Sequence, residues 1–82
     1  MYSVEFTKVA EKQLNNLPDL LHNRILLTLD RIKVNPFRHI KRKQGTPYFI
    51  LRIGNYRTIL DIKQNKLLIL VLEIGPRGKI YK

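Results

Sequence analysis

The sequence contains no cysteine, and it has no apolar run long enough to cross a membrane. Without cysteine, neither a disulfide framework nor a thiolate zinc site is possible. The longest apolar run, residues 67–72, is far shorter than the ~20 residues that a membrane span needs. Residues 1–6 alternate polar and apolar side chains and lack the basic start and apolar core of a signal peptide. We therefore expect a single cytoplasmic domain, residues 1–82, with no membrane partner.

Histidine and acidic residues are also scarce, and this limits the available chemistry. His22 and His39 are too few and too far apart in sequence to suggest a metal site. We expect His39 to be a solvated loop residue rather than a catalytic one. Asp61 and Glu73 resemble salt-bridge partners for nearby arginines more than a magnesium site. The glycine loop with which nucleotide enzymes bind phosphate is missing as well. The sequence therefore predicts no metal and no other cofactor.

Positive charge, in contrast, is abundant and unevenly distributed. Sixteen lysines and arginines against six acidic residues give a net charge of +10. Residues 1–30 carry a net charge of −1, whereas residues 31–82 carry +11. A domain with such a field attracts polyanions, and each phosphate that it neutralises releases condensed counterions. This charge favours a nucleic acid or an acidic protein as partner over a basic surface that only keeps the protein soluble.

The first part of the chain predicts one strand and two helices. Residues 2–6 alternate as in a strand, and Thr7 can cap a helix over residues 8–16. That helix is expected to turn three apolar residues to one side: Val9, Leu14 and Leu17. Pro18 suits the first position of a second helix, and Pro36 ends that helix because the residue before a proline leaves the helical region.

The second helix has more leucine than a single packed face requires. Its core stripe has spacings of four, four and three residues: Leu21, Ile25, Leu29 and Ile32. Leu20, Leu26 and Leu27 lie outside this stripe. Exposed, they would offer a groove to an amphipathic helix of a partner protein.

The second part of the chain predicts three strands, over residues 48–53, 56–63 and 67–74. Gly54 and Asn55 form a two-residue turn, in which the glycine can adopt the positive φ of a type II′ turn. Short turns between consecutive strands imply an antiparallel meander. The predicted fold class is α+β, with an N-terminal strand and a two-helix hairpin packed on an antiparallel sheet that ends in a three-strand meander.

The strand period places several cations together. Arg52 and Arg57 flank the hairpin turn and are expected to point to the exposed face of the sheet, opposite the core face. Arg77 follows the last strand and could reach the same face. Guanidinium groups that converge in this way suit bidentate contact with phosphate. The alternative is that the strand arginines pair with Asp61 or Glu73.

A basic segment at residues 38–43 precedes the meander. Five of its six residues can carry positive charge. We expect a loop whose Lys41, Arg42 and Lys43 bind the RNA backbone, and the alternative is a loop that serves only solubility.

These segments resemble the RelE/ParE superfamily of toxin–antitoxin toxins. The resemblance rests on LRIGNYR at 51–57, IGPRGKIY at 74–81, YSVEFT at 2–7, LP at 17–18 and NP at 35–36. It covers essentially the whole chain and implies the fold derived above. It also implies one of two activities, ribosome-dependent mRNA cleavage as in RelE or gyrase inhibition as in ParE.

The resemblance implies roles for individual residues. Arg57 and Arg77 match the family's catalytic arginines, Arg52 a supporting one, and Tyr81 the C-terminal tyrosine that positions or activates the nucleophile. Lys79 is expected to help bind RNA. RelE carries lysines where this chain has Tyr48 and Ile50, so a match by residue does not supply the proton-transfer groups.

The first expectation is thus a toxin that cleaves mRNA on the ribosome, with mRNA, the ribosome and a net-acidic, helix-containing, RelB-like antitoxin as partners. The second is a non-enzymatic gyrase inhibitor or a relative that has lost its activity.

Overall fold

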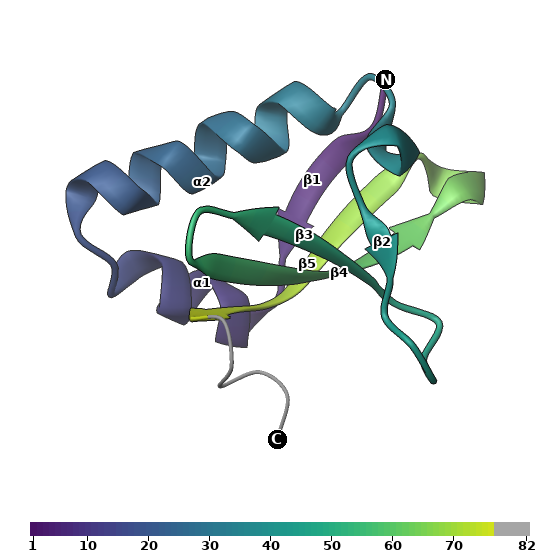
Figure 1. Ribbon diagram of the computed structural model, residues 1–82. Coiled ribbons are helices and arrows are strands. Elements are labelled where there is room, and N and C mark those ends of the chain that lie inside the picture. Colours follow the sequence, from purple (N-terminus) through teal and green to yellow (C-terminus); the bar gives the residue numbers. More distant parts are fainter. Residues whose placement is uncertain (77–82) are drawn as a thin grey trace.

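The computed structural model describes residues 1–76, in which two helices lie on one face of a five-stranded sheet (Figure 1). The elements, with two short 3-10 helices written η, are β1 Ser3–Phe6, α1 Lys8–Asn15, α2 Asp19–Ile32, η1 Pro36–Arg38, β2 Lys41–Arg42, β3 Phe49–Ile53, β4 Tyr56–Lys63, η2 Gln64–Lys66 and β5 Leu68–Pro76. This order confirms the α+β class, the helical hairpin and the C-terminal meander.

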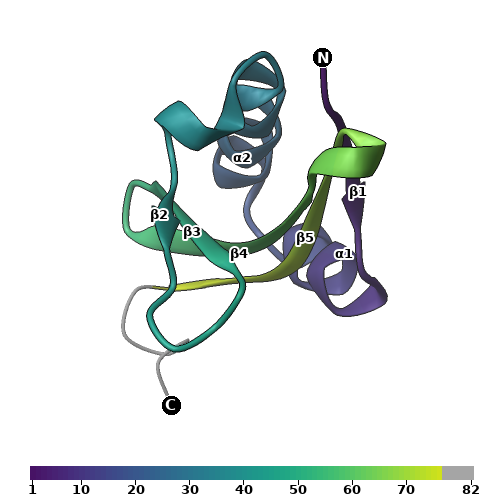
Figure 2. The ribbon, with the colours of Figure 1, turned by 90° about the vertical axis from the view of Figure 1, so that its right-hand side faces the viewer.

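The sheet is mixed, with strand order β1-β5-β4-β3-β2. The meander is antiparallel as predicted, but β1 runs parallel to β5. An alternating pattern reveals that a strand is present without giving its partner or its direction, so the sequence could not specify this pairing. Figure 2 shows β1 at one edge of the sheet and β2 at the other.

Strand β2 lies within the segment predicted as a loop. Lys41 pairs with Ile50 and Arg42 with Phe49 across an antiparallel ladder. Two paired residues are too few to give an alternating pattern, which explains why the sequence showed only a basic segment.

The helices cover the sheet through the predicted stripe of α2, and through a residue of α1 other than the predicted Val9. Ile25, Leu29 and Ile32 are buried, as predicted. On α1 the buried residues are Ala10 and Leu14, whereas Val9 is 56% exposed. Residues four apart share a helix face, so Leu14 brings Ala10 and not Val9 to the core, and the expectation for Val9 was wrong.

Hydrogen bonds from α1 fix the irregular part of β5. The hydroxyl of Thr7 caps α1 by accepting from the Ala10 N–H (3.1 Å), and it donates to the Leu72 carbonyl (2.9 Å). Leu72 is the extra residue of a bulge, because Ile59 pairs with Glu73 while the next residue of β4 pairs with Val71. The residue that caps α1 therefore holds β5 at its bulge, a few residues before the C-terminal end of the strand.

The β3–β4 turn forms as predicted, with Gly54 at φ +60°. The guanidinium of Arg24, on α2, packs against it, and a Cβ at position 54 would lie 2.9 Å from an Arg24 nitrogen. This contact brings a cation of the helical layer to the end of the hairpin.

Candidate nucleic-acid interface

The face of the sheet opposite the helices carries two rows of side chains. Cross-strand register aligns Lys41, Ile50, Ile59 and Glu73 in one row, and Arg52, Arg57 and Gly75 in the next. Directly opposed residues of an antiparallel pair have Cβ atoms about 5 Å apart, so Arg52 and Arg57 are immediate neighbours on this face. The prediction that these two arginines share a face is confirmed.

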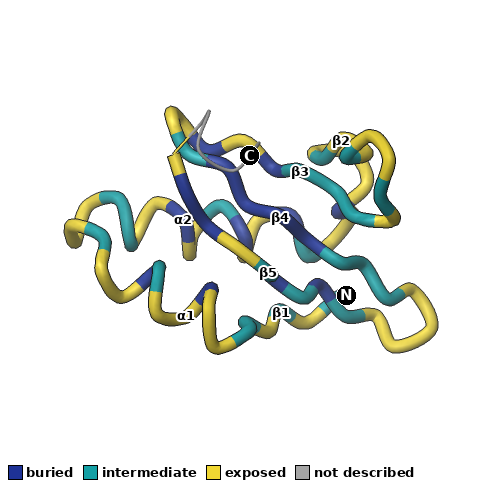
Figure 3. Tube along the Cα trace, turned by 90° about the horizontal axis from the view of Figure 1, so that it is seen from below, coloured by how far each residue is buried: buried dark blue, intermediate teal, exposed yellow. Residues whose placement is uncertain are grey.

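The two arginines differ sharply in exposure. Arg52 is exposed, but Arg57 is only 2% exposed, and it has an interaction partner. The expectation that Arg57 lies on an exposed face was wrong. Strand β4 lies between β3 and β5, and Arg57 is paired with Arg52 on one side and Gly75 on the other. Arg52 lies beyond the end of the two-residue β2 and has a neighbouring strand on one side only. Figure 3 shows that β4 is buried along much of its length.

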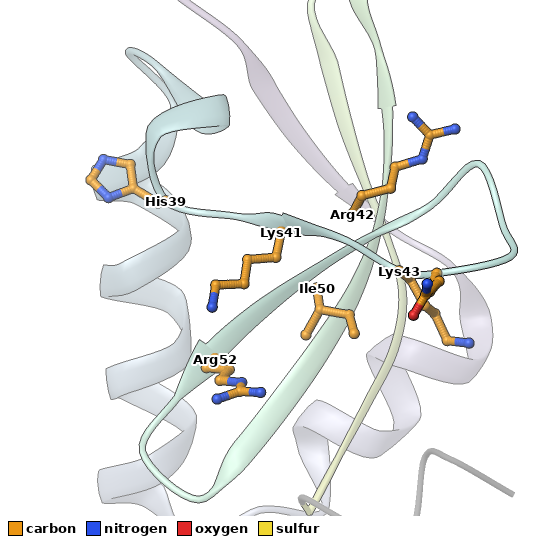
Figure 4. Close-up of a pocket in the computed structure, with 7 residues that line it drawn as sticks. His39, Lys41, Arg42, Lys43, Ile50 and Arg52 are labelled. Carbon is orange, nitrogen blue, oxygen red and sulfur yellow. The ribbon is translucent and has the colours of Figure 1, made fainter.

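A basic pocket of about 510 Å³ opens beside this face. Its lining residues are His39, Lys41, Arg42, Lys43, Gln44, Ile50 and Arg52. Four of the seven are lysine or arginine and none is acidic. In Figure 4 the side chains of Lys41, Ile50 and Arg52 lie on the same side of β2 and β3. A pocket with this lining suits a phosphate group.

The Arg42 side chain does not lie with those of Lys41, Ile50 and Arg52. It pairs with Phe49, whose side chain belongs to the helix-covered face, and its guanidinium lies 5.6 Å from the centre of the Phe49 ring. Figure 4 shows Arg42 pointing away from Lys41 and Arg52. The structure therefore brings Lys41, Lys43 and Arg52 to one pocket and places the Arg42 guanidinium outside it.

Among residues 1–76, no ion pair neutralises the basic pocket. Within residues 1–76, Asp61 pairs with Lys63 (3.2 Å), and Lys33 pairs with Asp30 (3.0 Å). In this part of the chain Arg52 makes no ion pair, so the alternative that it pairs with Asp61 or Glu73 does not apply to it. Arg77, Lys79 and Tyr81 lie outside the described residues.

A groove of about 680 Å³ runs between α2 and the β3–β4 turn. Three arginines and two exposed leucines contribute to it: Arg24, Arg31, Arg52, Leu20 and Leu27. Leu20 and Leu27 are 86% and 66% exposed, in agreement with the expected leucine excess. The contributions of Arg24 and Arg31 were missed. The signal was available, because residues 20, 24, 27 and 31 follow the helical period.

In the described chain, no cluster of histidine and acidic side chains could hold a metal ion. No helix in residues 1–76 is long and apolar enough to cross a membrane.

Comparison with known proteins identifies the family. A family model described as the ParE toxin of the type II toxin–antitoxin system parDE matches residues 4–81. A chain of the toxin–antitoxin complex RelBE2 from Mycobacterium tuberculosis is 25% identical, with a TM-score of 0.82 over 93% of this chain and 98% of that one. A chain of the archaeal RelE–RelB complex from Pyrococcus horikoshii OT3 is 27% identical, with a TM-score of 0.81 over 95% and 97%.

The isolated RelE toxin of E. coli shares the fold at 17% identity, with a TM-score of 0.78 over 99% of this chain and 92% of that one. No curated protein sequence matches the chain. The family match spans nearly all of the sequence, and the solved RelE structures have the same fold. The chain is therefore a member of the ParE toxin family of type II toxin–antitoxin systems, within the RelE/ParE superfamily.

Proposed function

We propose that this toxin is a metal-free, ribosome-dependent mRNA endoribonuclease that inhibits translation. The observation that carries the proposal is the basic pocket, which Lys41 and Arg52 line with no acidic residue among the lining residues. Arg57 lies directly opposite Arg52 on the same face of the sheet. The similarity to solved RelE toxins supports the same activity.

The reaction needs three contributions. A base removes the proton of a ribose 2′-hydroxyl, and the 2′-oxygen then attacks the adjacent phosphorus. The bond from phosphorus to the 5′-oxygen breaks, and an acid protonates that departing oxygen, leaving a 2′,3′-cyclic phosphate and a 5′-hydroxyl. Cationic donors stabilise the charge that develops on the phosphate.

Arg52 and Arg57 are proposed to supply that stabilisation. Arg52 is exposed and can meet a phosphate directly. Arg57 is 2% exposed, so its contact with phosphate requires this face to open when RNA binds. Arg77 and Tyr81, which follow β5, are proposed as catalytic residues from the superfamily resemblance, and Lys79 as an RNA-binding one.

Lys41 is the candidate replacement for a missing strand lysine. The register places it directly opposite Ile50, one of the two positions where RelE carries lysine. Its side chain points into the same pocket as Arg52 (Figure 4). An ammonium group supplies charge and a proton, so Lys41 fits the departing-oxygen side of the reaction. Lys43 is proposed to bind the RNA backbone beside it, and Arg42 to contact RNA from the other side of β2.

The groove along α2 is proposed to receive the antitoxin. An amphipathic helix with acidic side chains matches its exposed leucines and its arginines. Arg52 lines both this groove and the basic pocket. A carboxylate of the bound helix could therefore pair with Arg52 and compete with an RNA phosphate. The named relatives are toxin–antitoxin complexes, which supports a cognate antitoxin for this chain.

Primer extension on mRNA in a translation extract tests the proposal. The purified toxin should produce cuts within codons, and only when ribosomes are present. Uncut mRNA would refute it.

Gyrase inhibition is the second candidate, favoured by the match to the ParE toxin model. This activity should instead yield gyrase-dependent DNA breaks and leave mRNA intact.

A further inference from the structure

A small aromatic surface lies on the side of β2 that faces away from the Lys41 side chain. Phe37, on η1, meets Phe49 edge to face, with ring centroids 5.5 Å apart and ring planes at 74°. The Arg42 guanidinium lies 5.6 Å from the centre of the same Phe49 ring. Phe37, Phe49 and Arg42 are called the aromatic cluster below. An exposed ring and a guanidinium thus flank one partly buried ring.

The cluster is held in place and is accessible. Phe37 remains 40% exposed although its edge-to-face contact fixes the orientation of the ring. The Nε–H of Arg42 donates to the Thr46 carbonyl (3.1 Å), which holds the guanidinium in position. Arg42 makes no ion pair within residues 1–76. The cluster therefore presents an aromatic surface and a cationic group that no acidic side chain of the described chain neutralises.

Strand β2 connects this cluster to the basic pocket. Successive side chains of a strand point to opposite faces, so Lys41 enters the pocket while Arg42 joins the cluster. β2 is the edge strand and is two residues long. His39, two residues after Phe37, already lines the pocket. An RNA strand with a phosphate at Lys41 can thus pass around the edge of the sheet toward the cluster.

We propose that the aromatic cluster is a stacking subsite for a nucleobase of single-stranded RNA next to the basic pocket. The subsite rests on the proposed RNA-directed function and names where a base of the substrate would bind. Unpaired bases stack on phenylalanine rings and arginine planes, and such stacking tolerates any base because each has a π face. Phe37 provides the ring, and Arg42 provides a guanidinium plane or a phosphate contact.

Binding of two matched oligonucleotides tests the subsite. The first is a short fluorescein-labelled single strand of 2′-O-methyl RNA, which lacks the 2′-hydroxyl nucleophile and cannot be cleaved. The second has the same length and phosphates but abasic sugars at its central positions. The wild-type chain should bind the complete strand roughly tenfold more tightly. Equal affinity for the two strands would overturn the proposal whatever the variants do.

Variants at position 37 locate the effect. Phe37→Leu should abolish the preference for the complete strand, and Phe37→Tyr should retain it. The salt dependence of binding should stay unchanged in both, because the number of phosphate contacts is the same. Val34→Ala is the matched control, since Val34 is 73% exposed and lies near Phe37 in sequence. A preference that persists in Phe37→Leu would contradict the assignment.

Two further outcomes separate the possibilities. Equal loss of affinity for both strands in Phe37→Leu, with a lower melting temperature, would mean that Phe37 only packs against Phe49. Unchanged RNA binding with weakened antitoxin binding would assign the ring to a protein partner, which also overturns the proposal. A base preference without mRNA cleavage would refute the proposed enzyme and leave the subsite standing. Cleavage without a base preference would support the proposed enzyme and overturn the subsite.

Discussion

Removing two charges from the basic pocket should weaken RNA binding through lost phosphate contacts. The double variant Lys41→Gln/Arg52→Gln lowers the net charge from +10 to +8. Both side chains are exposed, and neither forms an ion pair in the described part of the chain. The fold should therefore be unaffected, and any loss of binding should come from the pocket itself.

The salt dependence gives the size of the effect. Each phosphate contact to a single strand contributes ~0.7 to the slope of log K against log salt concentration, so losing two contacts lowers the slope by ~1.4. Raising the salt concentration fourfold should then weaken the wild-type chain about sevenfold more than the variant. Fluorescence anisotropy of a labelled, uncleavable RNA at several salt concentrations measures both slopes.

A control with the same change in net charge separates local contacts from the overall field. Lys8→Gln/Lys12→Gln removes two exposed charges from α1, away from the pocket. Its slope should remain close to that of the wild-type chain. Equal slopes in all three proteins, or equal loss in both double variants, would refute the pocket as the phosphate site.

Substitutions at Arg57, Leu27 and Gly54 test the catalytic, partner and turn assignments. Arg57→Lys keeps the charge but loses the planar fork, so single-turnover cleavage should slow about a hundredfold, or ~3 kcal/mol, with the melting temperature nearly unchanged. Arg57→Ala also removes a buried side chain, worth ~2 kcal/mol, and should lower the melting temperature by about 10 °C; an unchanged cleavage rate in both variants would remove Arg57 from the site. Leu27→Glu should weaken antitoxin binding measured by calorimetry, whereas Val9→Glu on the other helix should not; equal affinities would place the antitoxin elsewhere. Gly54→Ala forces an L-residue into φ +60° and should destabilise the chain by ~1 kcal/mol in thermal melting; a stabilised variant would contradict the turn assignment.

The regular elements could be predicted because local chemistry specifies them. Thr7 caps α1, and Gly54 occupies the turn at positive φ, as the sequence indicated. The stripe of α2 reached the core because a period of 3.6 residues leaves one apolar face. The partner and direction of β1 depend on contacts with residues more than sixty positions away, and no local pattern records them.

The site could be predicted only in part, because some of its features depend on contacts that no local sequence pattern records. The alternation of β3 and β4 placed Arg52 and Arg57 on one face, and the register confirms this. Exposure depends on contacts that strand alternation does not record, so the burial of Arg57 could not be predicted from the sequence. The pocket also depends on β2, which is too short to leave a pattern, so the opposite orientations of Lys41 and Arg42 required the structure.

Primer extension on mRNA in a translation extract, with the wild-type chain and with Lys41→Gln/Arg52→Gln, distinguishes the proposed ribonuclease from a gyrase inhibitor. Ribosome-dependent cuts within codons are expected for the wild-type chain, and much weaker cutting is expected for the variant. A parallel DNA-cleavage assay with gyrase should show no breaks. Intact mRNA together with gyrase-dependent DNA breaks would contradict the proposed ribonuclease activity.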